Sequence, residues 1–217
     1  MILTQAKPFE EILDSLKDKT KIFLIGCGEC ATACKTGGEP ELLLLKQKLE
    51  EAGKTVIGWC IPQSTCVSAK LKSELAKQII NLRKAEVVLV LSCGLGVQSV
   101  KDNDRLGLVI LPANNTVAAV LRDSQGRFLE KCSFCGECLL DKTEGICPIT
   151  LCPKGLLNGP CGGMDKGKCE VDKNRDCAWV LIWKEAQNKN NLEIFKRILP
   201  ARDYTKSIKP HFVQDIR

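Results

Sequence analysis

Cysteine is the residue that most constrains this chain. The 217 residues include 14 cysteines but only one histidine. Seven disulfide bonds would use all 14 cysteines, but proteins rich in disulfide bonds are usually short and secreted. The start of the chain shows no basic segment followed by an apolar one, so no secretory signal is visible and we expect a cytoplasmic protein. Metal ligation is therefore the better interpretation of the cysteines.

Composition argues against two classes of partner. The longest uncharged apolar runs, such as residues 87–91, are far shorter than the roughly 20 residues that span a bilayer, so we expect no membrane span. The net charge of the chain is +6, but the region richest in cysteine is neutral, because residues 127–178 hold eight basic and eight acidic side chains. We therefore expect no nucleic-acid partner.

Hydrophobic periodicity predicts an α/β fold over residues 1–126. Short apolar runs typical of buried strands alternate with segments whose apolar residues fall at helical spacing. The predicted strands are residues 21–26, 54–59, 85–92 and 107–111, and the predicted helices are residues 41–51 and 68–84, with Ser68 as the candidate N-cap. Strands that alternate with helices form right-handed βαβ units, so we expect a parallel, Rossmann-like sheet.

The pattern changes after Arg127. The next segment holds eight cysteines but few other apolar side chains, so we expect metal to stabilise it in place of a large core. Apolar positions at helical spacing over residues 179–199 then predict a helix that Pro200 ends, followed by a basic tail. The sequence thus predicts an α/β domain (1–126), a small cysteine-rich metal-binding segment (127–178), and a C-terminal helix with its tail (179–217).

Six cysteines lie in the predicted α/β domain, close to the ends of its strands. They are Cys27, Cys30, Cys34, Cys60, Cys66 and Cys93. Because the carboxyl ends of parallel strands meet at one edge of a sheet, where open α/β folds bind ligands, we expect thiols there to converge on an iron–sulfur cluster. Alternatively, Cys60 and Cys93 are small buried hydrophobic residues, which is a common role of free cysteine. For Cys60 and Cys66 both interpretations remain open.

A nucleotide site is the competing interpretation of the first cysteine loop. Residues 26–31, Gly-Cys-Gly-Glu-Cys-Ala, match the pattern G-x-G-x-x-A directly after a strand. The second strand, however, ends in Trp59, Cys60 and Ile61 and lacks the acidic residue that binds a ribose. The glycines more readily let backbone N–H groups turn towards the sulfur atoms of a cluster. We therefore favour a cluster over a nucleotide.

The second set of cysteines resembles a ferredoxin run. It consists of Cys132, Cys135, Cys138 and Cys147, and Pro148 follows directly. Overlapping C-x2-C spacings allow one short loop to hold three irons of a [4Fe-4S] cube, and they favour a cluster over zinc. The fourth cysteine is farther away than in ferredoxins, so the fourth ligand is either Cys147 or a cysteine from elsewhere.

The third set consists of Cys152, Cys161, Cys169 and Cys177. Four thiolates suffice for a tetrahedral zinc ion or for another cube, and the irregular spacing does not distinguish them. The lone His211 lies in the basic tail, where we expect a solvated surface residue and not a metal ligand.

One stretch of the sequence resembles a known family. Residues 152–171, which include Gly-Pro-Cys-Gly-Gly, together with Cys177 and Trp179, resemble the signature of the methylenetetrahydrofolate reductase C-terminal family. The chain as a whole is similar to the MetV-type iron–sulfur subunits of the Wood–Ljungdahl reductase. This resemblance implies a separate flavin-containing (β/α)8 catalytic subunit as partner, to whose flavin the chain passes electrons from a donor such as ferredoxin or an NADH-oxidising flavoprotein.

Three functional hypotheses follow. The preferred one is a redox relay subunit with two or more [4Fe-4S] clusters, because the sequence shows no paired carboxylates, Ser/His/Asp set or Walker motif that would form a catalytic site. The second is a zinc-stabilised docking module without a redox role. The third is an independent enzyme with a labile, substrate-binding cluster at the sheet edge.

Overall fold

The computed structural model of the chain describes residues 1–209, which form two compact units. One unit comprises residues 1–118, and the other begins at residue 119. The predicted basic tail beyond residue 209, with His211, lies outside the described residues. No helix in the described part is long and apolar enough to cross a membrane.

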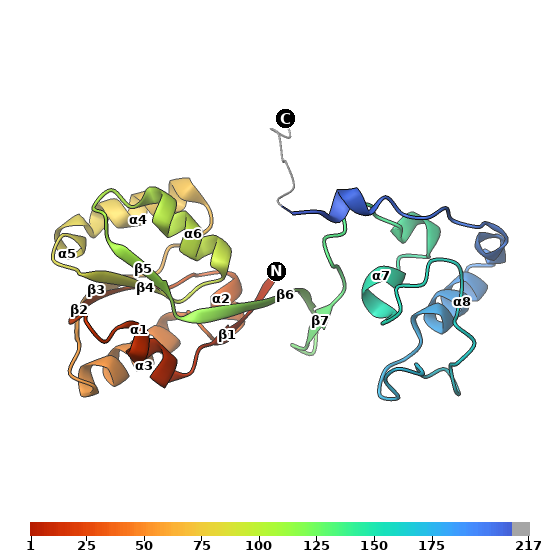
Figure 1. Cartoon of the computed structure of the whole chain (residues 1–217), viewed down its shortest axis with the longest axis horizontal. Helices are drawn as coiled ribbons and strands as arrows, with labels where there is room; N and C mark the ends of the chain where they lie inside the picture. Colours follow the sequence, from red (N-terminus) through yellow and green to blue (C-terminus); the bar gives the residue numbers. More distant parts are fainter. Residues whose placement is uncertain (210–217) are drawn as a thin grey trace. The chain divides into compact units, whose positions relative to one another are not determined.

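The first unit contains the predicted parallel sheet. Its strands are β2 (Lys21–Ile25), β3 (Thr55–Cys60), β4 (Val87–Val90) and β5 (Val109–Pro112), in the spatial order β3-β2-β4-β5 (Figure 1). All three strand pairs are parallel, which confirms the α/β prediction. The order reverses between β2 and β4, as in doubly wound sheets.

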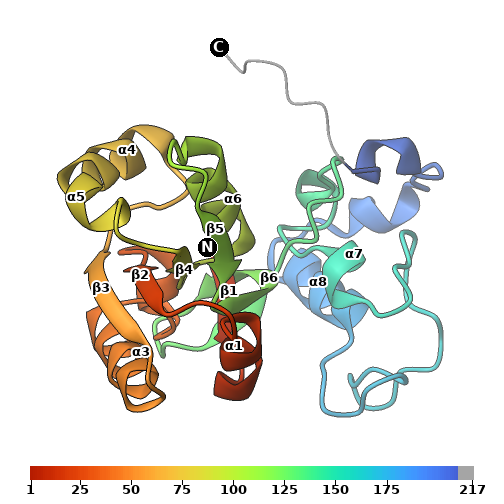
Figure 2. The ribbon, with the colours of Figure 1, turned by 60° about the vertical axis from the view of Figure 1, so that its left-hand side comes forward.

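Helices cover both faces of this sheet (Figure 2). They are α1 (Phe9–Ser15), α2 (Cys30–Ala33), α3 (Glu39–Glu51), α4 (Ser68–Lys77), α5 (Ile79–Leu82) and α6 (Gly94–Asn103). Strand residues alternate between the two faces. Ile22 and Leu24 pack with α1 and α3, whereas Phe23 and Ile25 pack with α4, α5 and α6.

Two details of the helices differ from the sequence prediction. The predicted helix 68–84 divides into α4 and α5 because Gln78 leaves helical geometry (φ −101°, ψ 9°). Its N-cap position is Val67, so Ser68 is the first helical residue and not the cap. Helix α3 begins with a side-chain contact instead, since the backbone N–H of Gly38 donates to the Glu41 carboxylate (3.1 Å).

A second, three-stranded sheet was not predicted. It has the order β1-β6-β7, with β1 (Ile2–Ala6), β6 (Asn114–Arg122) and β7 (Phe128–Glu130). Strands β6 and β7 form an antiparallel hairpin. Its turn is stabilised by Asp123, whose carboxylate accepts hydrogen bonds from the backbone N–H groups of Gln125 and Arg127 (both 2.9 Å).

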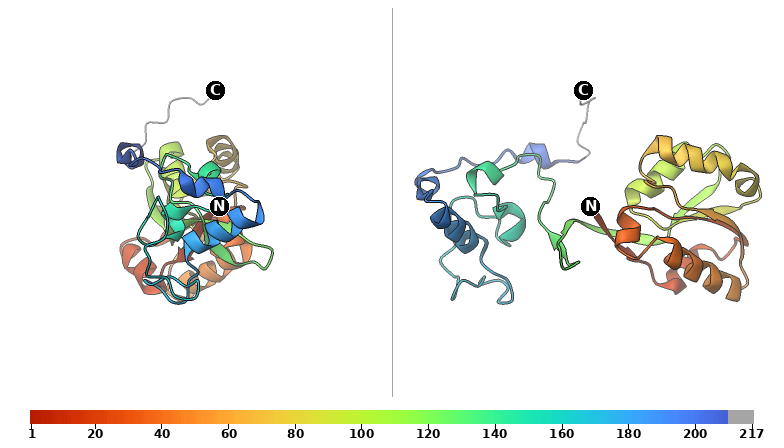
Figure 3. Two further views of the ribbon diagram at one scale, coloured as in Figure 1. Left: turned by 90° about the vertical axis from the view of Figure 1, so that its right-hand side faces the viewer. Right: turned by 180° about the vertical axis from the view of Figure 1, so that it is seen from behind.

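The second unit contains little regular structure (Figure 3). Its short elements are η1 (Leu140–Lys142), α7 (Pro148–Leu151), α8 (Ala178–Asn188), η2 (Leu192–Lys196) and η3 (Tyr204–Ser207). The cysteine-rich segment and the C-terminal helix are thus present. The helix ends earlier than predicted, because Asn190 adopts left-handed geometry (φ 54°) and the N–H of Asn191 turns back to the carbonyl of Ala186 (2.8 Å).

Gly37 offers a test of how tightly the sheet edge is packed. A Cβ atom at this position would overlap the carbonyl oxygen of Leu91, and the Gly37 carbonyl accepts a hydrogen bond from the N–H of Cys27 (3.0 Å). We expect Gly37→Ala to lower the free energy of unfolding by about 2 kcal/mol, measured by urea denaturation. Gly94→Ala is the control, since the nearest neighbour of its Cβ lies at 3.4 Å. Equal stability of the two variants would contradict the expectation.

Candidate metal centres

The carboxyl-terminal edge of the parallel sheet carries the first group of thiols. Cys27 lies in the loop after β2, and Cys93 follows β4 at the N-cap of α6. Because the strand order reverses between β2 and β4, the loops after these two strands diverge and leave the crevice in which such sheets bind ligands. Cys27 and Cys93 are both buried, so they are largely shielded from bulk solvent.

Four thiols interact at this edge. The pKa of Cys66 is raised, chiefly by partial burial and then by the negative charges of Cys93, Cys27 and Cys30. The charges of these three cysteines therefore act on Cys66, although within residues 1–209 no three such side chains are arranged as a metal site. We call Cys27, Cys30, Cys66 and Cys93 the edge cluster.

Hydrogen bonds join two of the three loops that supply this cluster. The Thr65 hydroxyl donates to the carbonyl of Gly26 (2.8 Å), and the N–H of Gly28 donates to the carbonyl of Pro62 (2.9 Å). A Cβ on Gly28 would lie 3.2 Å from the backbone oxygen of Gln63, so a larger residue would crowd this approach. The packing fixes Cys66 beside the loop that carries Cys27.

Cys34 is not part of the edge cluster, although it contacts the same strand as Cys30. Its thiol donates to the carbonyl of Ile2 in β1 (3.6 Å), and it is not among the groups that shift the pKa of Cys66. Cys30 contacts the same residue, because its sulfur accepts from the N–H of Ile2 (3.4 Å). Strand β1 therefore contacts the cysteine loop directly, a relation that sequence reasoning missed.

Cys60 lies in the hydrophobic core and not in the edge cluster. It packs with Phe23, Leu71 and Val88 on the sheet face covered by α4 to α6. Burial, assisted by the negative charge of Glu74, raises the pKa of its thiol to about 12. Of the two interpretations left open by the sequence, this environment favours a small buried hydrophobic residue.

Thiol chemistry can distinguish Cys60 from the edge cluster. In metal-free protein we expect Cys60 to resist iodoacetamide up to about pH 10, because a thiol with a pKa of about 12 remains protonated there. Cys66 also has a raised pKa but is exposed, so it should react before Cys60 as the pH rises. Mass spectrometry of quenched samples measures both rates. Equal rates in folded protein would contradict the assignment.

The second unit gathers the third set of cysteines. One cavity of about 20 Å³ is lined by all four of them, namely Cys152, Cys161, Cys169 and Cys177. The loops that carry them are joined by hydrogen bonds from the N–H of Cys177 to the carbonyl of Gly167 (2.8 Å) and from the N–H of Cys169 to the carbonyl of Arg175 (3.0 Å). A cavity of this volume accommodates about one water-sized particle. Its size matches a single ion better than a cube.

A carboxylate borders this cavity. The thiol of Cys161 donates to Glu170 (3.4 Å), and Lys154 forms an ion pair with the same carboxylate. The hydrogen bond from Lys154, followed by that from Cys161, lowers the pKa of Glu170. Sequence reasoning missed both Lys154 and Glu170, although each lies within two residues of a cysteine of the set.

The second set of cysteines is held by a residue from the far end of the chain. Arg202 donates from Nη2 to the carbonyl oxygens of Cys135 (3.3 Å) and Glu137 (3.2 Å). Lys206 pairs with the Glu137 carboxylate (3.5 Å). Burial alone would raise the pKa of Cys135, but hydrogen bonding with the backbone of Glu137 and the guanidinium of Arg202 together lower it. Residues 202–206 thus form a strap over the cysteine loop, where the sequence predicted only a tail.

These features of the second unit coincide with a known family. Residues 111–205 match the family described as methylene-tetrahydrofolate reductase C terminal. The match includes the hairpin, all eight cysteines of the second unit and most of the strap, and it spans less than half of the chain. Searches of curated proteins and of solved structures found no match. The similarity thus lies with methylenetetrahydrofolate reductase proteins, and the parallel sheet is largely outside it.

Within the matched region, residues 111–205, the four cysteines of the second set do not all lie in one loop. Cys132 and Cys135 share a loop whose geometry is fixed by a hydrogen bond from the N–H of Phe134 to the sulfur of Cys132 (3.5 Å). Cys147 lies at the N-cap of α7 and contacts the Thr150 hydroxyl (3.5 Å). All 14 cysteines are free thiols. Across residues 1–209, no three or more His, Cys, Asp or Glu side chains are already arranged as a metal site.

Substitution of Gly136 tests whether the strap, residues 202–206, needs its close approach to the cysteine loop. The φ of Gly136 is 77°, and a Cβ would overlap the carbonyl oxygen of Lys206. We expect Gly136→Ala to detach the strap, which should accelerate amide hydrogen exchange over residues 202–207 and lower the free energy of unfolding by about 2 kcal/mol. Gly145→Ala is the matched control, since this glycine also has a positive φ (80°) but nothing within 4 Å of a Cβ. Similar exchange in both variants would show that the close approach does not matter.

Proposed function

We propose that this chain is a MetV-like electron-transfer subunit of a methylenetetrahydrofolate reductase complex. It relays electrons through iron–sulfur clusters to the flavin of a separate catalytic (β/α)8 subunit. The proposal is supported by the family match over residues 111–205 together with the cysteines that follow β2, β3 and β4 at the carboxyl-terminal edge of the parallel sheet. Neither feature requires the chain itself to bind the folate.

The edge cluster has the donor set of a [4Fe-4S] site. Four free thiols from the three loops after β2, β3 and β4 supply the soft anionic ligands that iron prefers, and such a cluster exchanges single electrons. The protein's part is to bury Cys27 and Cys93 and to fix the loops through the contacts of Thr65 and Gly28. Burial and hydrogen bonding to the sulfurs are the means by which proteins set the potential of a cluster. Electrons from a ferredoxin or an NADH-oxidising flavoprotein would enter here or in the second unit.

The second unit offers two further sites. We assign a cluster to the loop of Cys132, Cys135 and Cys138, with Cys147 as the candidate fourth ligand, because the spacing suits a cube. For the third set we favour zinc, since its cavity of about 20 Å³ suits one ion. Arg202 would compensate part of the negative charge of the cluster loop, because it donates to two of the loop's carbonyls.

An exposed apolar surface on the second unit suits the catalytic partner. Trp183, Leu192, Phe195 and Ile198 are all exposed, and Ile198 retains 86% of its accessible surface. Aromatic side chains are enriched at the centres of interfaces. This surface also serves the alternative in which the chain docks a partner without redox work, and metal content separates the two.

Metal and sulfide analysis of anaerobically purified chain tests the proposal. We expect iron with acid-labile sulfide at two clusters per chain, and about one zinc. Cys30→Ser should remove the iron and sulfide of one cluster, whereas Cys60→Ser should retain both, because Cys60 lies in the core. With the flavin-containing subunit added, a reduced low-potential donor should reduce the flavin through the native chain and not through Cys30→Ser. Stoichiometric zinc without sulfide would refute the relay and favour the docking module.

A further inference from the structure

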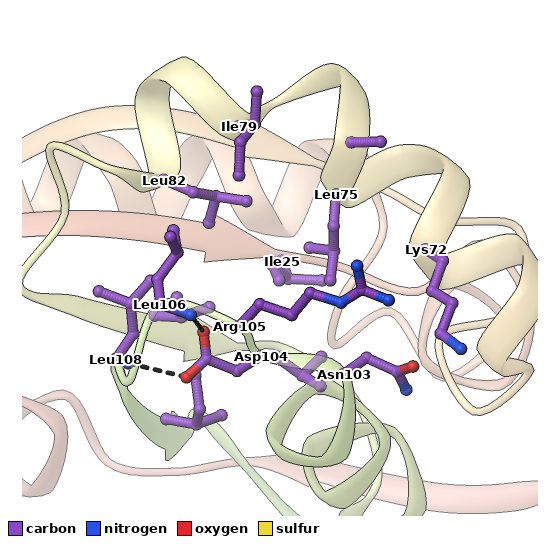
Figure 4. A pocket seen from close by; sticks show the side chains of 14 residues that line it. Ile25, Lys72, Leu75, Ile79, Leu82, Asn103, Asp104, Arg105, Leu106 and Leu108 are labelled. Carbon is purple, nitrogen blue, oxygen red and sulfur yellow. Dashed lines mark hydrogen bonds between the residues drawn. The ribbon is translucent and has the colours of Figure 1, made fainter.

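The sheet unit contains a cavity that involves none of its cysteines. It has a volume of about 420 Å³ and lies between α4 and α5 on one side and the end of α6 with the loop 104–108 on the other (Figure 4). Strand residues such as Val88 and Ile110 form its floor, and Leu75 and Ile79 contribute to its helical wall. Pockets of roughly 300–1,000 Å³ with predominantly apolar walls are the usual sites for small molecules.

Two cations reach this apolar cavity without a partner. Lys72 and Arg105 line it, and neither has a hydrogen bond or ion pair with another side chain in residues 1–209. Figure 4 shows the Arg105 side chain extending through the cavity towards the helix that carries Leu75 and Lys72. Placing cations beside apolar walls favours the binding of an anion there.

The neighbouring carboxylate forms no ion pair with either cation in the described residues. Asp104 also lines the cavity, but its two oxygens accept hydrogen bonds from the backbone N–H groups of Leu106 (3.0 Å) and Leu108 (2.8 Å). The carboxylate therefore holds the loop before β5 in place and leaves the guanidinium of Arg105 available. A guanidinium presents paired N–H donors in the geometry that a carboxylate accepts.

We propose that this cavity binds a small organic carboxylate with an apolar body. The carboxylate pairs with Arg105 and Lys72 at the rim, and the apolar body lies against Leu75, Ile79 and the strand residues of the floor. The proposal does not depend on metal or on electron transfer, because no cysteine lines the cavity. In the alternative structural role, Arg105 only covers apolar surface with its aliphatic stem, and the cavity then has no preference for anions.

Isothermal titration of the full chain with naphthalene-2-carboxylate tests the proposal. The neutral 2-naphthylmethanol has the same ring system without the charge, and acetate has the charge without the ring. We expect the naphthoate to bind about tenfold more tightly than the alcohol, since a charge-assisted hydrogen bond contributes roughly this factor, and acetate not to bind measurably. Equal binding of naphthoate and alcohol, or no binding of the naphthoate, would overturn the proposal.

Variants locate the binding. Arg105→Gln and Lys72→Gln should each remove most of the preference for the naphthoate while retaining weak binding of the alcohol. Lys70→Gln and Arg83→Gln are the matched controls, because these exposed cations lie on α4 and at the end of α5 but do not line the cavity. Ala76→Phe should weaken both ligands by filling the cavity. Naphthoate binding that all three cavity variants leave unchanged would place the ligand elsewhere and refute the site.

Discussion

The pairing of β2 with β4 is the constraint on which the edge cluster depends. Ile25 at the end of β2 lies opposite Val90 at the end of β4, so the two strands finish at the same level. The loops that follow carry Cys27 and Cys93. A shift in this register would separate these sulfurs and would also exchange the sheet faces on which Phe23 and Leu24 pack. The same hydrophobic alternation therefore stabilises the sheet and positions the thiols.

The second unit reaches order by different means. Its buried apolar cluster centres on Cys177, Trp179 and Ile182, and Trp179 also donates from its indole N–H to the carbonyl of Leu156 (3.0 Å). So small a cluster contributes little stability, whereas ligand binding by thiolates couples directly to folding. Metal at the third set would join loops that are otherwise connected by a few backbone hydrogen bonds. A hydrophobic core thus stabilises the first unit, whereas the proposed metal sites would stabilise the second.

Residue pattern predicted the parallel sheet, because short buried strands alternate with helices, and strand direction predicted that Cys27 and Cys93 follow strands at the same edge. The sequence alone could not show that Cys60 lies in the hydrophobic core whereas Cys66 lies among the thiols of the sheet edge. A register irregularity where Ile22 and Phe23 pair with Val56 and Gly58 changes the alternation along β3, so that Cys60 faces the core beside Ile57. The contacts of Arg202 and of Ile2 with cysteine loops were equally hidden, since they join residues 28 to 67 positions apart and leave no local signal.

The strap has a consequence for the order in which the protein matures on the ribosome. The residues of the sheet and its edge cluster are all synthesised before residue 119, so that site can assemble while the rest of the chain is still being made. The loop at Cys135 is different, because it acquires its contacts with Arg202 and Lys206 only after residue 206 has been synthesised. If both sites hold metal as we propose, the sheet-edge site can therefore form before the loop at Cys135 is closed by the strap.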